Sequence, residues 1–116
     1  MLFRSFLQFS TAKALPPDEL EMMLAYNMEV PARVRRHLLH RPAAYEATLR
    51  KITVPVLVTH GIEDRVALVP MARYTESVVA NAQVSLYNGV GHMPFWEDAS
   101  RFNRELDEFV TKCNRG

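Results

Sequence analysis

Apolar residues in the first part of the chain recur every three to four positions, the spacing of amphipathic helices. Pro16 and Pro17 precede Asp18 and Glu19, and proline followed by acidic residues favours a helix start. Pro42 cannot continue a helix and is expected to end one. The pattern predicts short helices over residues 2–9, 17–28, 33–41 and 43–51, the second with an apolar face formed by Leu20, Met23, Leu24 and Met28.

A different pattern begins at Val54, where the apolar run to Val58 predicts a strand buried on both faces, as in a parallel sheet. Residues 83–87 alternate as a second strand, and residues 70–80 form a helix between the two, which predicts a parallel βαβ unit. Asp98 is the expected N-cap of a last helix. The faces expected to point inward carry Met71, Tyr74, Val78 and Val79 in the crossover helix and Phe102, Leu106, Phe109, Val110 and Cys113 in the last helix.

The charge and composition of the 116 residues narrow the classes of function. Fourteen basic and 13 acidic side chains leave a net charge of +1, so neither nucleic acid nor a membrane is expected as partner, and a small-molecule substrate remains open. Cys113 is the single cysteine, which excludes an internal disulfide and favours a cytoplasmic location. No apolar run approaches the roughly 20 residues of a membrane span, and the first residues lack a signal-peptide pattern.

Asp64 and His92 are the candidate catalytic residues. Each follows a predicted strand, and the carboxyl ends of parallel strands meet at one edge of a sheet. Glycines at positions 61, 89 and 91 allow tight turns there. A carboxylate bonded to one imidazole nitrogen fixes the tautomer, so that the other nitrogen can take a proton from a hydroxyl nucleophile. The pair therefore supplies two thirds of a catalytic triad.

Other acids and histidines offer alternatives. Glu63 neighbours Asp64 but is expected to point elsewhere, and Asp98 is better explained as a helix cap. His60 is expected to be hydrogen-bonded within the sheet edge. His37 and His40 have metal-ligand spacing, but two histidines without a third ligand rarely make a site, so no metal is expected.

Two segments, VPVLVTHGIEDRV and LYNGVGHMPFWED, resemble the last two catalytic segments of the α/β-hydrolase fold, which includes esterases, haloperoxidase-like perhydrolases and dehalogenases. Gly61 and Val66 flank Asp64 as in the acid segment of that family, and Gly91 and Pro94 flank His92 as in its histidine segment. The order of acid before histidine also agrees. The family's G-x-S-x-G nucleophile segment does not occur in the sequence.

The resemblance implies an α/β fold, a partial α/β-hydrolase with a doubly wound parallel sheet. Residues 1–50 would form a helical lid segment, and residues 51–116 the C-terminal part of the catalytic domain. The implied activity is hydrolysis of a small carboxylic ester without a cofactor, by a serine outside this sequence. The isolated chain is then expected to be inactive and to need the N-terminal half of the fold or self-association. The alternative is a catalytically silent fragment that binds a partner chain or a hydrophobic ligand.

Overall fold

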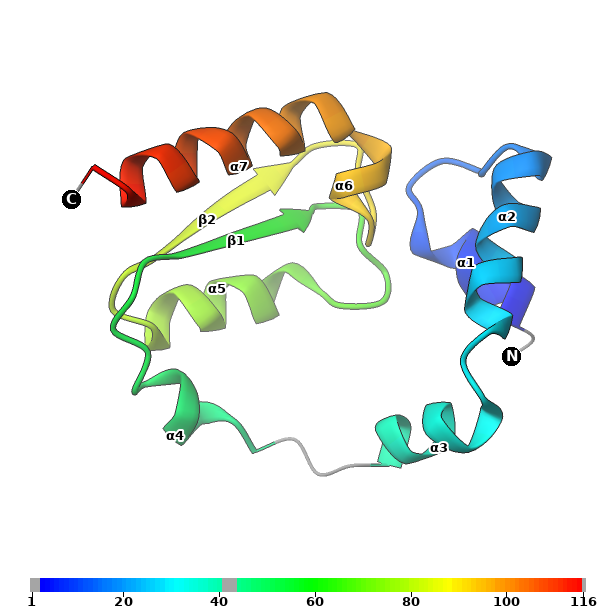
Figure 1. Cartoon of the computed structure of the whole chain (residues 1–116), viewed down its shortest axis with the longest axis horizontal. Helices are drawn as coiled ribbons and strands as arrows, with labels where there is room; N and C mark the ends of the chain where they lie inside the picture. The colour runs from blue at the N-terminus through cyan, green and yellow to red at the C-terminus, as the bar shows by residue number, and fades with distance from the viewer. Residues whose placement is uncertain (1–2, 41–43, 116) are drawn as a thin grey trace.

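A computed structural model describes residues 3–40 and 44–115 and shows short helices around a small sheet (Figure 1). The helix expected over residues 43–51 is shorter than predicted and spans Glu46–Leu49. Residue 43 and Pro42, which was expected to end the preceding helix, lie outside the described residues. One short helix before the last one was not predicted. The elements, in chain order, are α1 (Phe3–Ser10), α2 (Pro17–Met28), α3 (Ala32–His40), α4 (Glu46–Leu49), β1 (Val56–Gly61), α5 (Val69–Val78), β2 (Ala82–Tyr87), α6 (Pro94–Glu97) and α7 (Ala99–Cys113).

The sheet has two parallel strands in the described residues, with α5 as the connection between them. Val56 pairs with Ala82 at one end and Gly61 with Tyr87 at the other. In Figure 1, α5 lies on one side of the sheet and α7 on the other, and both arrowheads point towards α6. The predicted parallel βαβ order is confirmed. Because both strands end at the same edge, the loops that follow them start side by side.

A small apolar core joins α1 to α2 beyond that edge of the sheet. Leu7, Leu20 and Met23 are buried together, and Met93 from the loop after β2 packs against them. The predicted inward position of Met28 is wrong, since its side chain is exposed. The cluster includes Leu24 but no later residue of α2, so the last turn of this helix extends beyond the residues that pack against it.

The strand expected to be buried on both faces is only half-buried from Val56 to His60, and Val54 lies before it. In α5, Val78 is buried as predicted, but Met71 is 61% exposed. The physical reason is the width of the sheet, because two strands cannot cover the apolar faces of two helices and two sheet sides. The other positions expected inside but found exposed are Tyr74, Leu106, Val110 and Cys113.

The last helix is held to β2 mainly by polar contacts. Asp98 caps α7 by accepting the N–H of Arg101, as predicted. The guanidinium of Arg101 donates to Ser85 Oγ and to the Leu86 carbonyl, both at 3.0 Å. The hydroxyl of Tyr87 donates to Glu105, and burial together with this carboxylate raises the pKa of Tyr87 to about 12.

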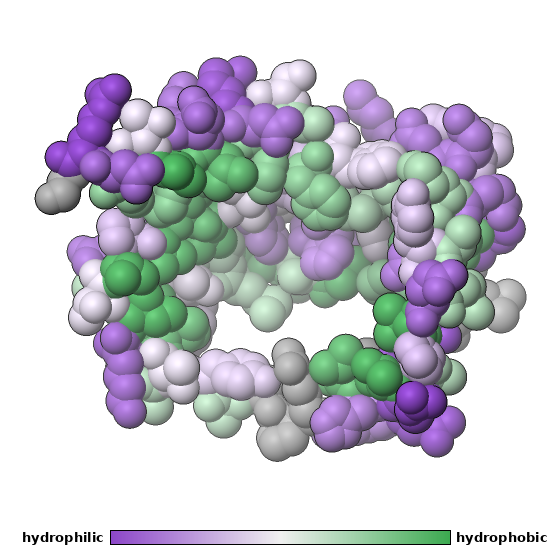
Figure 2. Space-filling model, viewed as in Figure 1, coloured by the Kyte–Doolittle hydropathy of each residue, from purple (hydrophilic) through white to green (hydrophobic). Residues whose placement is uncertain are grey.

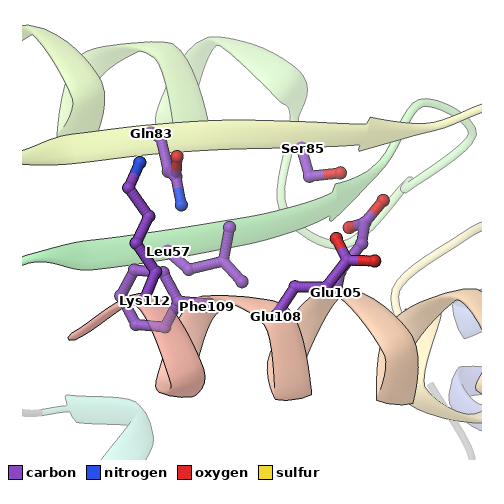
Figure 3. Close-up of a pocket in the computed structure, with 7 residues that line it drawn as sticks. All are labelled: Leu57, Gln83, Ser85, Glu105, Glu108, Phe109 and Lys112. Carbon is purple, nitrogen blue, oxygen red and sulfur yellow. The ribbon is translucent and has the colours of Figure 1, made fainter. Parts of the chain in front are cut away.

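Further along α7 the helix and the strands are separated by a hollow (Figure 3). Leu57 and Phe109 are its apolar lining residues, and the other labelled side chains are polar. No residue of α7 is buried. The helix is therefore fixed at its start and incompletely packed towards its end.

The chain is expanded for its length. Its radius of gyration is 16.1 Å, whereas a compact domain of this size has a value of about 13 Å. Figure 2 shows hydrophobic surface beneath the C-terminal half of α7 and near α3, around an opening between α5 and the α3 side of the molecule. None of the helices in the described residues is long and apolar enough to cross a membrane.

Candidate active site

Asp64 lies in the turn that follows β1 and is buried, with 6% of its surface exposed. Its Oδ1 accepts the backbone N–H groups of Val66 at 2.8 Å and Ala67 at 2.9 Å. These bonds close the turn and fix the carboxylate without occupying Oδ2. The second oxygen therefore remains available to a partner from another loop.

That partner is His92, which follows β2 after a turn in which Gly89 adopts a φ of 69°. Its Nδ1 lies 2.8 Å from Oδ2 of Asp64. The predicted contact between the two side chains is confirmed. The Asp64 side chain is 3% exposed and the His92 side chain 40%. The carboxylate is therefore shielded from solvent, whereas the imidazole is accessible to it.

The electrostatics of the pair define its protonation. Burial opposes the charged form of Asp64, but the hydrogen bonds from His92, Ala67 and Val66 outweigh it, and the pKa of Asp64 is lowered from its ordinary value. An ionised carboxylate only accepts hydrogen bonds. Nδ1 of a neutral His92 must then carry the proton, which leaves the lone pair on Nε2. An imidazole in this tautomer can act as a general base.

The alternative residues do not compete for this role. Glu63 is exposed, and Asp98 caps α7. His60 Nε2 lies 2.8 Å from the Ala67 carbonyl and 3.6 Å from Asp64 Oδ2, too far for a hydrogen bond. Since a carbonyl only accepts, His60 donates to Ala67 and holds the turn that carries Asp64 in place.

Two glycines allow the loops to pack at backbone contact. A Cβ on Gly61 would lie 2.0 Å from the Gly91 carbonyl oxygen, and a Cβ on Gly91 would lie 2.7 Å from the backbone nitrogen of Ala12. The Glu63 N–H also donates to the Val90 carbonyl at 2.9 Å. The separation of Asp64 and His92 is thus set by backbone packing.

The end of α1 and the residues directly after it contribute to this edge, which the sequence did not reveal. The His92 N–H donates to the Ser10 carbonyl at 2.6 Å, and Arg65 donates to the Thr11 carbonyl at 2.8 Å. The Arg65 guanidinium also lies 4.7 Å from the centre of the Phe9 ring. The Ser10 hydroxyl donates to the Phe6 carbonyl, so it is not placed as a nucleophile. Only the polar break at Ser10 and Thr11 marked the segment in the sequence.

Glu97 is a further residue of this edge whose role was not predicted from the sequence. Its carboxylate accepts backbone N–H groups on both sides of His92. The signal available in the sequence was its place one turn after Pro94, which starts α6. His37 and His40 lie on α3, and the described residues contain no cluster of three side chains that could hold a metal.

No model of a known protein family matches the sequence. Among curated proteins, the chain is 35% identical over 66 residues to a 2-hydroxy-6-oxononadienedioate/2-hydroxy-6-oxononatrienedioate hydrolase of Cupriavidus pinatubonensis. This alignment covers 57% of the chain and 23% of that enzyme. The chain therefore matches about a quarter of the length of this relative.

Solved structures extend the similarity to almost the whole chain. An esterase from Rhodococcus sp. superimposes with a TM-score of 0.82 and 30% identity, over 95% of this chain and 40% of that one. An esterase from Exiguobacterium antarcticum gives a TM-score of 0.85 at 21% identity, over 93% of this chain and 41% of that one. The chain therefore has part of the α/β-hydrolase fold and is related in sequence to hydrolases of that fold.

Proposed function

We propose that this chain supplies the acid and the histidine of a Ser-Asp-His triad that hydrolyses a carboxylic ester. The observation that carries the proposal is the contact of 2.8 Å between Asp64 Oδ2 and His92 Nδ1, at the carboxyl edge of the sheet. The names of the relatives, which are hydrolases and esterases, support the reaction class. The nucleophile would come from a part of the fold that these 116 residues do not include.

In this proposal His92 Nε2 takes the proton of a serine hydroxyl while the serine oxygen attacks the ester carbonyl carbon. Asp64 stabilises the imidazolium through the bond to Nδ1. The imidazolium then gives its proton to the leaving alcohol, and an acyl-enzyme remains. Water, deprotonated by the same imidazole, releases the acid and restores the serine. Donors for the oxyanion would also come from outside this sequence.

We also propose that the remainder of the hydrolase fold packs against this chain. The expanded radius of gyration and the exposed apolar residues of α3, α5 and α7 support this arrangement. Apolar surface of this kind on a soluble protein marks an interaction site. Residues 1–50 would form the lid segment, and residues 51–116 the C-terminal part of the catalytic domain. Cytoplasmic location stays a prediction.

A chimera tests the proposal. This chain replaces the matching part of the Rhodococcus esterase, whose other residues are expected to supply the serine and the oxyanion donors. We expect the chimera to hydrolyse p-nitrophenyl acetate and His92→Ala to abolish the turnover, while the 116-residue chain alone shows none. A folded chimera without activity, or activity that survives His92→Ala, would contradict the proposal.

The second candidate function is that of a catalytically silent chain that binds a partner or a hydrophobic ligand. The exposed apolar faces of α3 and α7 favour it, and they do not depend on the triad. The chimera separates the two candidates. An inactive chimera, together with tight binding of the esterase remainder to this chain, would favour the silent chain.

A further inference from the structure

One carboxylate joins three backbone N–H groups from separate parts of the edge. Glu97 Oε1 accepts the N–H of Gly91 at 2.9 Å and the N–H of Met93 at 3.2 Å. Its Oε2 accepts the N–H of Ala12 at 2.7 Å, a contact across 85 positions in the sequence. Since Gly91 and Met93 flank His92, the carboxylate holds the backbone on both sides of the imidazole.

The backbone of His92 itself is held from the same direction. Its N–H donates to the Ser10 carbonyl, two residues before Ala12. Two of three consecutive N–H groups in this loop therefore donate to Glu97, and the one between them donates to Ser10, close to the Ala12 that Glu97 also binds. Hydrogen bonds to an ionised carboxylate are stronger than those between neutral groups.

The helix α6 keeps Glu97 in reach of the loop. The Glu97 N–H donates to the Met93 carbonyl at 2.8 Å, while the Met93 N–H donates to the Glu97 side chain. This reciprocal pair alone would describe a helix cap. A cap does not require the bonds to Gly91 and Ala12, which lie outside α6 and fix the loop against the segment after α1.

We propose that Glu97 is a positioning residue, whose carboxylate sets the place of the His92 imidazole against Asp64. Its importance for turnover rests on the proposed function, but its effect on the imidazole does not. Glutamine has the same shape and offers one oxygen and one NH₂ group. In Glu97→Gln, either orientation of the amide places its NH₂ group against at least one of the three backbone N–H groups. At least one hydrogen bond to the loop or to Ala12 is then lost, while the volume of the side chain stays the same.

The first test uses the full chain and needs no activity. Hydrogen exchange followed by mass spectrometry is expected to show faster exchange in Glu97→Gln within residues 10–12 and 91–93, with β1 and β2 unchanged. NMR of the imidazole nitrogens is expected to show a smaller share of the Nδ1–H tautomer of His92. The matched control is Glu19→Gln, which neutralises the carboxylate that accepts the Nε1–H of Trp96 on α6 at 2.7 Å, and which has no hydrogen bond to residues 91–93 in the described part of the chain.

Each other outcome overturns the proposal. Faster exchange throughout the chain would mean that Glu97 only stabilises the fold. Local exchange with an unchanged His92 tautomer would mean that Glu97 holds the loop against the segment after α1 without setting the place of the imidazole. Unchanged exchange, or the same changes in Glu19→Gln, would remove the specific role of this carboxylate.

The second test measures turnover in the chimera. Glu97→Gln is expected to lower kcat roughly 10- to 100-fold with KM nearly unchanged, since a small misplacement of a catalytic group acts on the reaction rather than on binding. A rise in KM alone would overturn the positioning role. If the parent chimera is inactive while the exchange and tautomer changes occur as expected, the proposed function fails and the role of Glu97 in placing His92 stands.

Discussion

The carboxyl edge of the sheet differs in its packing from the exposed apolar faces of α3 and α7. These faces carry Val34 and Leu38 on α3 and Leu106 and Val110 on α7, and we call them the outer faces. At the edge, buried polar groups meet their partners at close range, as Asp64 does with Val66, Ala67 and His92. Every buried side-chain nitrogen or oxygen in the described residues has a hydrogen-bond partner. On the outer faces, Leu38 and other apolar side chains remain exposed, and no residue of α7 is buried.

This contrast separates what the chain determines by itself from what it leaves open. The relation between Asp64 and His92 is set by bonds and backbone contacts among residues 10–97, all within this sequence. The outer faces have the apolar spacing of helices that pack against a sheet, but the two-stranded sheet is too narrow to bury them. We therefore expect changes at the edge to have large, local effects, and changes on the outer faces to act on association.

The largest effect is expected for Asp64→Asn in the chimera. An amide can donate to Nδ1 and favour the wrong tautomer, which lowers turnover about 10⁴-fold in a serine protease. We expect a decrease of this order in kcat while circular dichroism shows an intact fold. Near-parental turnover would move the acid role to Glu63 or Asp98, and Glu63→Gln and Asp98→Asn serve as the matched controls.

The next effect tests the backbone contact between the two loops. In Gly61→Ala the new methyl group would lie 2.0 Å from the Gly91 carbonyl oxygen, a backbone atom that cannot move alone. We expect a loss of roughly 3 kcal/mol of unfolding free energy, at the upper end for overpacked sites. Urea unfolding followed by fluorescence of the single tryptophan, Trp96, measures it.

Gly89→Ala is the matched control, because it adds the same methyl group where no atom lies within 4 Å. Its cost comes only from the positive φ of 69°, about 1 kcal/mol. Equal losses in the two variants would show that loop contact does not set the geometry of the edge.

The edge could be predicted from local sequence, because each step depended on near neighbours. Apolar runs marked the strands, glycines marked the turns, and parallel pairing then brought Asp64 and His92 together. Asp98 was identified as a cap for the same reason. The roles of Glu97 and Ser10 could not be predicted, since their bonds to the histidine loop depend on how α1 and α6 pack.

The errors in the predicted core have a different origin. Periodicity correctly placed Met71 and Leu106 on apolar helix faces, but it cannot say whether a covering element is present. Both side chains are exposed here, whereas Val78 and Val79 of the same pattern are buried. Burial was predicted wrongly at positions where the two-stranded sheet is too narrow to cover the helix. The same lack of cover distinguishes the outer faces from the carboxyl edge.

The pH dependence of stability gives a smaller test of the edge. The folded-state pKa of Asp64 lies below its ordinary value of 3.8, so its carboxylate adds stability above about pH 4. That contribution is lost as the pH falls through the lowered pKa. We expect the difference in unfolding free energy between the parent chain and Asp64→Asn to narrow from pH 6 to pH 3. A constant difference would contradict a charge-dependent bond to His92.

The smallest effect on folding, and the sharpest test of the outer faces, is expected for Leu38→Lys. Leu38 is 49% exposed on α3, so its replacement should change the unfolding free energy by no more than about 0.5 kcal/mol. If exposed apolar faces drive association, the variant should shift the mass in light scattering towards the 13.3 kDa of one chain. His37→Lys adds the same charge to α3 without removing an apolar side chain, and it should leave the association unchanged. A parent chain that is already monodisperse at the mass of one chain would show that these faces need no cover.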